Sequence, residues 1–329
     1  MIKRYCLFIF IVLGVSVVHA QTLQTNIPAH DPAMIKQDSV YYLFCTGRGI
    51  SMWSSKDRIN WKREKPVFDT LPWAVRTIPG FRNHIWAPDI SFHNGLYYLY
   101  YSVSAFGKNT SCIGVATNKT LHPGSADYKW TDHGKLIQSV PGRDMWNAID
   151  PNLIQDEKGT SWLAFGSFWN GIKLVKLKDD LKSVAQPEEW HTIASRQRNF
   201  YLPDSAAGNA AIEAPFVFKK DGYYYLFVSF DYCCQGEKST YKMVTGRSKK
   251  IEGPYIDGEG VYMNLGGGTL LLQGDNNWNG VGHNAVTSFD GIDYLIFHGY
   301  DAKDKGKSKL RMEKLKWVNG WPQVERSGE

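Results

Sequence analysis

Five acidic or histidine side chains recur at comparable places along the chain. They are Asp31, Asp89, Asp150, Glu213 and His283. If folding brings them together, burial and mutual repulsion disfavour their ionisation, so such a cluster is costly unless it performs chemistry or holds a cation. Two carboxyl groups on either side of a glycosidic bond, one protonated and one ionised, are sufficient for its hydrolysis. A third carboxylate nearby raises the pKa of the acid.

Each of these residues opens a segment with the same plan. An apolar strand follows the opening, then usually a Gly-containing turn, then a strand rich in Tyr, Leu and Phe. The turns are Asn94-Gly95, Lys158-Gly159, Asp221-Gly222 and Asp290-Gly291. Asn-Gly and Asp-Gly between apolar runs are strong hairpin signals, because both turn residues must adopt positive φ.

The five openings lie 58 to 70 residues apart. Five such units predict an all-β fold, a five-bladed β-propeller. Because the first strand of each blade lies nearest the axis, the openings would point into one small volume. A β-sandwich or jelly roll is the alternative fold, but it does not explain why every repeat opens with the same kind of residue.

Residues 1–20 have the features of a secretory signal peptide. Lys3 and Arg4 precede an apolar run from Leu7 to Val18, and Val18-His19-Ala20 is a suitable cleavage site. The run is short for a bilayer, so an uncleaved anchor is the less favoured alternative. We expect residues 21–329 to form a single propeller domain, secreted to the periplasm or the extracellular space and not inserted in a membrane.

The formal charge of +6 falls to +4 without Lys3 and Arg4, and the remaining charges are dispersed. Nothing in this pattern predicts a nucleic-acid partner, and a monomer is the default expectation. Four cysteines follow residue 20: Cys45, Cys112, Cys233 and Cys234. A bond between the adjacent pair is disfavoured by strain. A disulfide from one of that pair to Cys45 or Cys112, and buried free thiols, both stay open.

Six stretches resemble glycoside hydrolase family 43, and within it the endo-acting α-1,5-L-arabinanases. In chain order they are His30-Asp31-Pro32, Trp86-Ala87-Pro88-Asp89, Asn147-Ala148-Ile149-Asp150-Pro151, Gly166-Ser167-Phe168-Trp169, Ile212-Glu213-Ala214-Pro215 and Gly282-His283-Asn284. Each motif alone is weak, but six in the right order are specific. The resemblance implies arabinan, including the side chains of pectin, as the substrate.

The resemblance also implies roles for individual residues. Asp31 would be the general base, Glu213 the general acid, and Asp150 the group that orients Glu213 and tunes its pKa. His283 would hold a largely hydrated calcium ion on the axis. The substrate would contact Asp31, Trp86, Asn147, Ala148, Ile149, Asp150, Ser167, Phe168 and Trp169, with Gly114 approaching it by its backbone. Apart from the resemblance, Asp89 is either another catalytic carboxylate or the anchor of a loop through accepted backbone N–H groups, and the structural role is favoured.

Reaction by single displacement with inversion predicts carboxyl groups of Asp31 and Glu213 roughly 6.5–9.5 Å apart. The stretch from Gly166 to Lys173 resembles the endo-acting subgroup. An exo-acting α-L-arabinofuranosidase or β-xylosidase on the same fold is one alternative. A non-catalytic carbohydrate-binding propeller is another, although such a protein would not need the three carboxylates.

Overall fold

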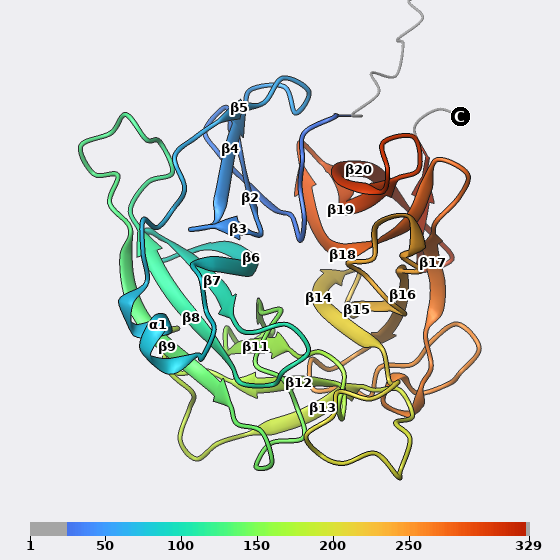
Figure 1. Cartoon of the computed structure of the whole chain (residues 1–329). Coiled ribbons are helices and arrows are strands. Elements are labelled where there is room, and N and C mark those ends of the chain that lie inside the picture. The colour runs from blue at the N-terminus through green and yellow to red at the C-terminus, as the bar shows by residue number, and fades with distance from the viewer. Residues whose placement is uncertain (1–24, 327–329) are drawn as a thin grey trace, which may run out of the picture.

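The computed structural model describes residues 25–326, which form five antiparallel sheets around a central axis (Figure 1). The predicted five-bladed β-propeller is therefore confirmed. The predicted signal peptide at residues 1–20 lies outside the described residues, so both it and the domain boundary at residue 21 stay predictions.

The strands of each blade follow one another in chain order from the axis outwards. Blade 1 contains β1 (Ala33–Gln37), β2 (Val40–Cys45), β4 (Ser51–Ser55) and β5 (Lys62–Arg63). Blade 2 contains β6 (His84–His93), β7 (Leu96–Val103), β8 (Ser111–Asn118) and β9 (Thr131–Ser139), with β3 (Gly47–Arg48) added beside β6. Blade 3 contains β10 (Asn152–Gln155), β11 (Ser161–Phe165), β12 (Ile172–Lys176) and β13 (Trp190–Ala194).

Blade 4 contains β14 (Ile212–Lys220), β15 (Tyr223–Phe230), β16 (Lys242–Ser248) and β17 (Thr269–Gln273). Blade 5 contains β18 (Trp278–Phe289), β19 (Ile292–Asp301), β20 (Lys307–Val318) and β21 (Trp321–Glu325). The helical elements are short: α1 (Pro72–Thr77), η1 (Gly236–Lys238) and η2 (Met263–Leu265). Within residues 25–326, no helix has the length and apolar character needed to cross a bilayer.

The hairpin turns form where the sequence predicts them. Both residues have positive φ in Asn94-Gly95 (47° and 81°), Asp221-Gly222 (48° and 73°) and Asp290-Gly291 (52° and 81°). These are the backbone angles that tight two-residue hairpins require and that Asn, Asp and Gly tolerate. The turns therefore fix the register between the first and second strands of their blades.

The apolar core lies between neighbouring blades. Phe44 and Ile50 of blade 1, for example, pack with Leu99 and Tyr101 of blade 2, and all four are fully buried. Comparable clusters join the other four pairs of neighbouring blades. Each blade is thus held by apolar burial on both faces, which fixes the openings of the inner strands relative to one another.

The first described residues close the ring. Ala29 donates its N–H to the carbonyl of Ser308, at 3.4 Å, and Leu310 donates to the carbonyl of Ile27, at 3.1 Å. Residues 27–29 therefore pair with β20 of blade 5, just before the chain enters blade 1. The last blade is joined to the first immediately beside Asp31.

Of the two alternatives left open for the cysteines, a disulfide to Cys45 or Cys112 and buried free thiols, only the second is found. Cys233 and Cys234 form a disulfide with each other, so the prediction that neighbours would not bond was wrong. They lie in the turn after β15, where Asp231 and Cys234 both have a φ of 67°. Cys45 and Cys112 are buried free thiols.

Candidate active site

The five blade openings share one backbone feature. Asp31, Ala87, Asp150, Ala214 and His283 all have positive φ, between 46° and 60°, and the first four are followed by proline. This corrects the register inferred from the sequence: Glu213 lies one residue before the shared position and Asp89 two residues after it. The β-bulges at these openings shift the strand pairing, and the pattern of acidic residues does not reveal them.

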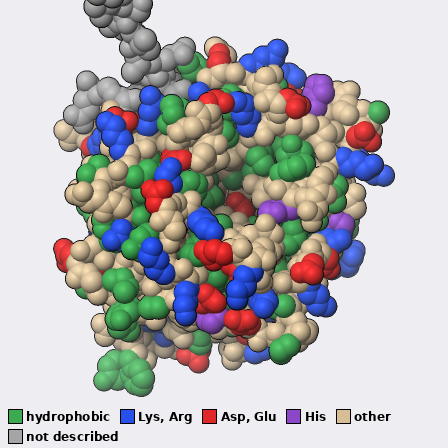
Figure 2. All heavy atoms as spheres, turned by 180° about the vertical axis from the view of Figure 1, so that it is seen from behind, with side chains coloured by type: hydrophobic (Ala, Val, Ile, Leu, Met, Phe, Trp, Pro, Cys, Tyr) green, Lys and Arg blue, Asp and Glu red, His purple; other side chains and the backbone are tan. Residues whose placement is uncertain are grey.

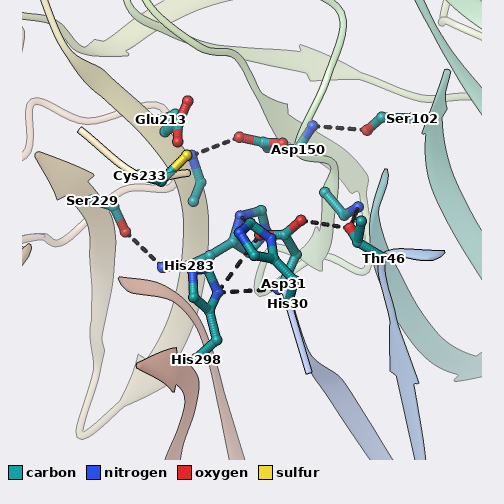
Figure 3. Close-up of polar contacts among 12 residues, drawn as sticks. His30, Asp31, Thr46, Ser102, Asp150, Glu213, Ser229, Cys233, His283 and His298 are labelled. Carbon is teal, nitrogen blue, oxygen red and sulfur yellow. Dashed lines mark hydrogen bonds and ion pairs between the residues drawn. The ribbon is translucent and has the colours of Figure 1, made fainter. Parts of the chain in front are cut away.

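A ring of hydrogen bonds links the openings from blade to blade. In each of the five, a side chain of the preceding blade accepts the N–H of the positive-φ residue. The bonds run from Ala87 to Thr46 (2.8 Å), Asp150 to Ser102 (3.0 Å), His283 to Ser229 (2.9 Å) and Asp31 to His298 Nδ1 (3.1 Å). In the fifth, Ala214 donates to Asp150 Oδ2 at 3.0 Å. These bonds hold the site residues in place (Figure 3).

Asp31 is buried and surrounded by donors. Its Oδ1 lies 2.8 Å from His30 Nδ1 and 3.0 Å from His283 Nδ1, and its Oδ2 accepts from the Thr46 hydroxyl at 2.5 Å. Burial alone would raise the pKa of Asp31, but the charges of His283 and His30 hold it well below its usual range. Asp31 is therefore ionised and able to accept a proton.

Glu213 and Asp150 reach the same volume from blades 4 and 3 (Figure 3). Glu213 accepts two hydrogen bonds, from the Ser167 hydroxyl to Oε2 and from the Tyr241 hydroxyl to Oε1, both at 2.8 Å. Burial raises the pKa of Asp150 to about 8; His283 opposes this shift, while the charges of Glu213 and Asp31 add to it. Asp150 therefore keeps its proton at neutral pH.

His283 carries the balancing positive charge. Burial would lower its pKa, but Asp31 and Asp150 raise it to about 9. On the face shown in Figure 2, the surface is hollowed near the centre of the ring, and acidic and histidine side chains lie beside the hollow.

The other residues predicted to contact the substrate differ in exposure and in their neighbours. Ser167 lies beside Glu213, and Phe168 is half-buried with its ring 6.2 Å from that of Tyr232. Trp86 is half-buried, and its Nε1 donates to His84. Trp169 is 1% exposed and donates to the carbonyl of Asp204. Trp169 therefore offers no free ring face for a sugar in this conformation.

Asn147, Ala148 and Ile149 are buried in the loop before blade 3. Within residues 25–326, Asn147 Oδ1 is buried and has no hydrogen-bond partner. Gly114 lies in β8, and a Cβ there would come within 2.5 Å of Tyr101 Cζ. Tyr101 thus gives Gly114 a packing role, and the predicted contacts of all these residues with substrate stay predictions.

Asp89 has the structural role expected of it. It accepts the N–H of Leu153 at 2.8 Å, across the boundary between blades 2 and 3. Burial raises its pKa to about 6.

Sequence reasoning missed four residues around the site: His30, Tyr241, His298 and Tyr300. His30 was in a recognised motif without a role. His298 and Tyr300 lie two residues apart on β19 and so face the same side of the sheet. Their proximity to Asp31 depends on ring closure, for which the sequence carries no local signal.

The residues near the axis are compatible with a hydrated calcium ion. Asn284, next to His283, is buried, and neither Oδ1 nor Nδ2 has a hydrogen-bond partner within the described residues. Calcium prefers oxygen ligands and often keeps waters, so this amide fits such an ion, and His283 would join it through Nε2 only by releasing the proton on that atom. His30, Asp31 and His298 also lie close together, but His298 Nδ1 already accepts the N–H of Asp31.

A β-propeller in which an ionised Asp31 lies with the carboxyl groups of Asp150 and Glu213 has the groups that the carboxylate-dependent class of glycoside hydrolases uses. Comparison with known proteins narrows this class. The model of the family "Glycosyl hydrolases family 43" matches residues 25–322. The chain therefore belongs to glycosyl hydrolase family 43.

Two curated relatives and one solved structure are similar over most of their length. An extracellular exo-α-(1→5)-L-arabinofuranosidase of Cellvibrio japonicus is 54% identical over 91% of this chain and 87% of its own. An extracellular endo-α-(1→5)-L-arabinanase of Bacillus subtilis is 44% identical over 89% and 86%. The structure of a Cellvibrio cellulosa α-L-arabinanase with arabinohexaose has a TM-score of 0.90 at 54% identity, covering 91% of this chain and 96% of that one.

Proposed function

We propose that this glycoside hydrolase cleaves α-1,5-linked L-arabinan by single displacement with inversion. The observation that carries the proposal is the convergence of the ionised Asp31, the Glu213 carboxyl and the protonated Asp150 on one volume near the axis (Figure 3). The names of both curated relatives support the choice of substrate. The polysaccharide is then the partner that the site binds, and the proposed reaction requires no nucleic acid.

In this mechanism Asp31 draws a proton from a water molecule, which attacks the anomeric carbon. Glu213 gives a proton to the leaving oxygen, so one carboxyl gains the proton that the other loses. Ser167 and Tyr241 fix the orientation of Glu213. Asp150 accepts the backbone N–H of Ala214, the residue next to Glu213, and so fixes the position of the acid. A calcium ion held by His283 would supply further positive charge beside Asp31.

The two curated relatives are named for different positions of cleavage along the polysaccharide chain. The sequence motifs favour endo cleavage, whereas the relative with 54% identity is named exo-acting and the endo-acting one has 44%. This difference favours exo attack as the more specific proposal. Chromatography of early products from linear arabinan decides: one short product from the first minutes supports exo attack, and a ladder of oligosaccharides supports endo cleavage.

The catalytic roles are tested with Asp31→Ala and Glu213→Ala. Each variant should lose at least roughly a thousandfold in kcat, the scale of positioned acid–base catalysis, and melt as a folded protein. Proton NMR of the first product should show the inverted anomer. Full activity in Glu213→Ala would remove the acid assignment. Wild-type protein that binds arabinan without cleaving it would instead be a carbohydrate-binding propeller.

The relatives are named extracellular, which supports secretion of this protein after cleavage near residue 20. Mass spectrometry of protein recovered from the periplasm or medium tests this: a mature N-terminus at or near Gln21 is expected.

A further inference from the structure

Two aromatic side chains on the face that carries the site are almost completely exposed to solvent. Phe200 and Tyr201 are each 91% exposed, and their ring centroids lie 5.8 Å apart with the planes nearly perpendicular. Both belong to the connection between β13 and β14, which extends to the rim of the ring of blades (Figure 1). Because the four strands of blade 3 alternate in direction, β13 ends on the face where β10 and β14 begin, beside Glu213.

The backbone that carries these rings is a fixed turn. Leu202 donates its N–H to the carbonyl of Asn199 at 3.2 Å, so Phe200 and Tyr201 are the two central residues of a β-turn. The side chain of Asn199 accepts the N–H of Tyr201 at 3.0 Å, and its backbone N–H donates to Asn209 Oδ1 at 2.9 Å. These bonds join the two limbs of the connection and leave both rings in solvent.

Arg198 orders the second limb of the same connection. Its guanidinium donates to the carbonyls of Leu202 (3.2 Å), Pro203 (2.6 Å) and Ala206 (2.9 Å). Charge-assisted hydrogen bonds of this kind offset the loss of conformational freedom in the loop. The exposed rings are therefore displayed by an ordered loop, and apolar side chains displayed in this way indicate a binding surface.

Both limbs are attached to turns beside Glu213. Arg196, in the first limb, pairs with Asp231 in the turn after β15 at 2.8 Å. In the second limb, the carbonyl of Asp204 accepts the Nε1–H of Trp169 at 2.9 Å. Trp169 lies in the turn after β11, which also supplies the donor to Glu213 Oε2. The aromatic turn therefore lies at the outer end of a continuous surface that begins at the proposed acid.

We propose that Phe200 and Tyr201 form a distal subsite, which binds the polysaccharide chain several sugar units away from the bond that is cleaved. The two rings offer a face and an edge to one sugar, whose apolar C–H surface stacks on aromatic rings. One such contact is weak alone, but a chain that is already bound at the axis presents its next sugars to the turn at high effective concentration. The inference rests on the proposed function, because it takes the proposed substrate as its ligand.

The chain-length dependence of KM tests the subsite. The double variant Phe200→Ala/Tyr201→Ala is compared with wild type on linear arabinan and on the shortest α-1,5-linked oligosaccharide that the wild type cleaves. We expect KM for arabinan to rise roughly three- to tenfold, the factor of one aromatic contact, with kcat little changed. The kinetics on the short oligosaccharide should not change, because it does not extend to the turn. An equal loss on both substrates, or an unchanged KM for arabinan, overturns the proposal.

Single substitutions separate stacking from other effects. Tyr201→Ala should raise KM for arabinan, whereas Tyr201→Phe should not, because the ring rather than the hydroxyl makes the contact. A rise in both variants overturns the stacking contact. Phe92→Ala is the matched control, since Phe92 is also an exposed ring beside another aromatic residue, Tyr97, but lies near the end of β6, on the opposite face. It should leave KM unchanged, and all variants should melt as folded proteins.

A binding assay without turnover separates this inference from the proposed function. In native gels that contain linear arabinan, Glu213→Ala protein should migrate more slowly than in gels without it, and adding Phe200→Ala/Tyr201→Ala should remove part of this retardation. Unchanged retardation overturns the inference, whatever the activity. A change in solution mass without a change in retardation would instead assign the rings to contact between copies of the chain, and would also overturn it. If wild-type protein were retarded through this pair but cleaved no arabinan, the proposed function would fail and the subsite would remain.

Discussion

The hydroxyl of Tyr241 offers a sharp test of the acid assignment. It donates to Glu213 Oε1 at 2.8 Å, and its ring is 1% exposed. A Cβ on Gly282 would lie only 2.2 Å from Tyr241 Cδ1, so this glycine lets the ring pack directly against β18. The ring therefore has little freedom, and Tyr241→Phe removes the hydrogen bond while leaving the packing in place.

The expected magnitude follows from that single bond. A hydrogen bond to an ionisable group contributes about 1.5–3 kcal/mol, which corresponds to roughly a 10- to 150-fold change in rate if it is needed in the transition state. Ser167 still holds Oε2 in the variant, so we expect the lower half of this range. KM should change little, because Tyr241 acts on the acid.

The assay is the release of reducing sugar from linear arabinan at saturating substrate, with a thermal melt for each variant. Tyr100→Phe is the control, because it also removes a buried hydroxyl, one that donates to the carbonyl of Leu181 in blade 3. Combining Tyr241→Phe with Ser167→Ala should cost more than the sum of the single changes, since Glu213 would lose both donors. A kcat for Tyr241→Phe equal to that of the control would refute the reasoning.

Three further predictions concern stability and ion binding. Because the pKa of Asp150 is raised to about 8, its bound proton stabilises the fold at acidic pH, and this contribution is lost as pH rises from about 4 to about 8. In chemical denaturation over that pH window, the free energy of unfolding of Asp150→Asn should therefore change less with pH than that of the wild type. Gly114→Ala should destabilise the protein by about 1–3 kcal/mol through its clash with Tyr101, and a raised KM with unchanged melting temperature would instead favour the predicted sugar contact. A chelator should lower the melting temperature of the wild type, and added calcium should restore it. His283→Ala should show neither shift. A wild-type melting temperature that does not respond to the chelator would argue against the calcium ion.

The sequence predicts the fold through local signals. Asn94-Gly95 and Asp290-Gly291 specify their turns because few residue types tolerate positive φ, and recurrence of the same unit implies radial repetition. Asp31, Asp150 and His283 are placed correctly because they occupy the shared position itself. Glu213 reaches the site from one residue earlier, through a bulge whose position depends on pairing with β15.

The partners of these groups are harder to predict from the sequence. His298 and Tyr300 lie more than 260 residues from Asp31 in the chain and meet it only when the ring closes. The disulfide was missed because the adjacency of Cys233 and Cys234 was taken to disfavour a bond that the turn after β15 accommodates.

Ring closure and catalysis depend on the same contacts. The proposed base lies in blade 1 and the proposed acid in blade 4, so the shorter path between them crosses blade 5. His298 of β19 holds the backbone of Asp31, and Ser229 of blade 4 holds that of His283. The carboxyl separation that selects inversion is a matter of a few ångströms. A small opening between blades 5 and 1 would therefore alter the chemistry before it unfolded the protein.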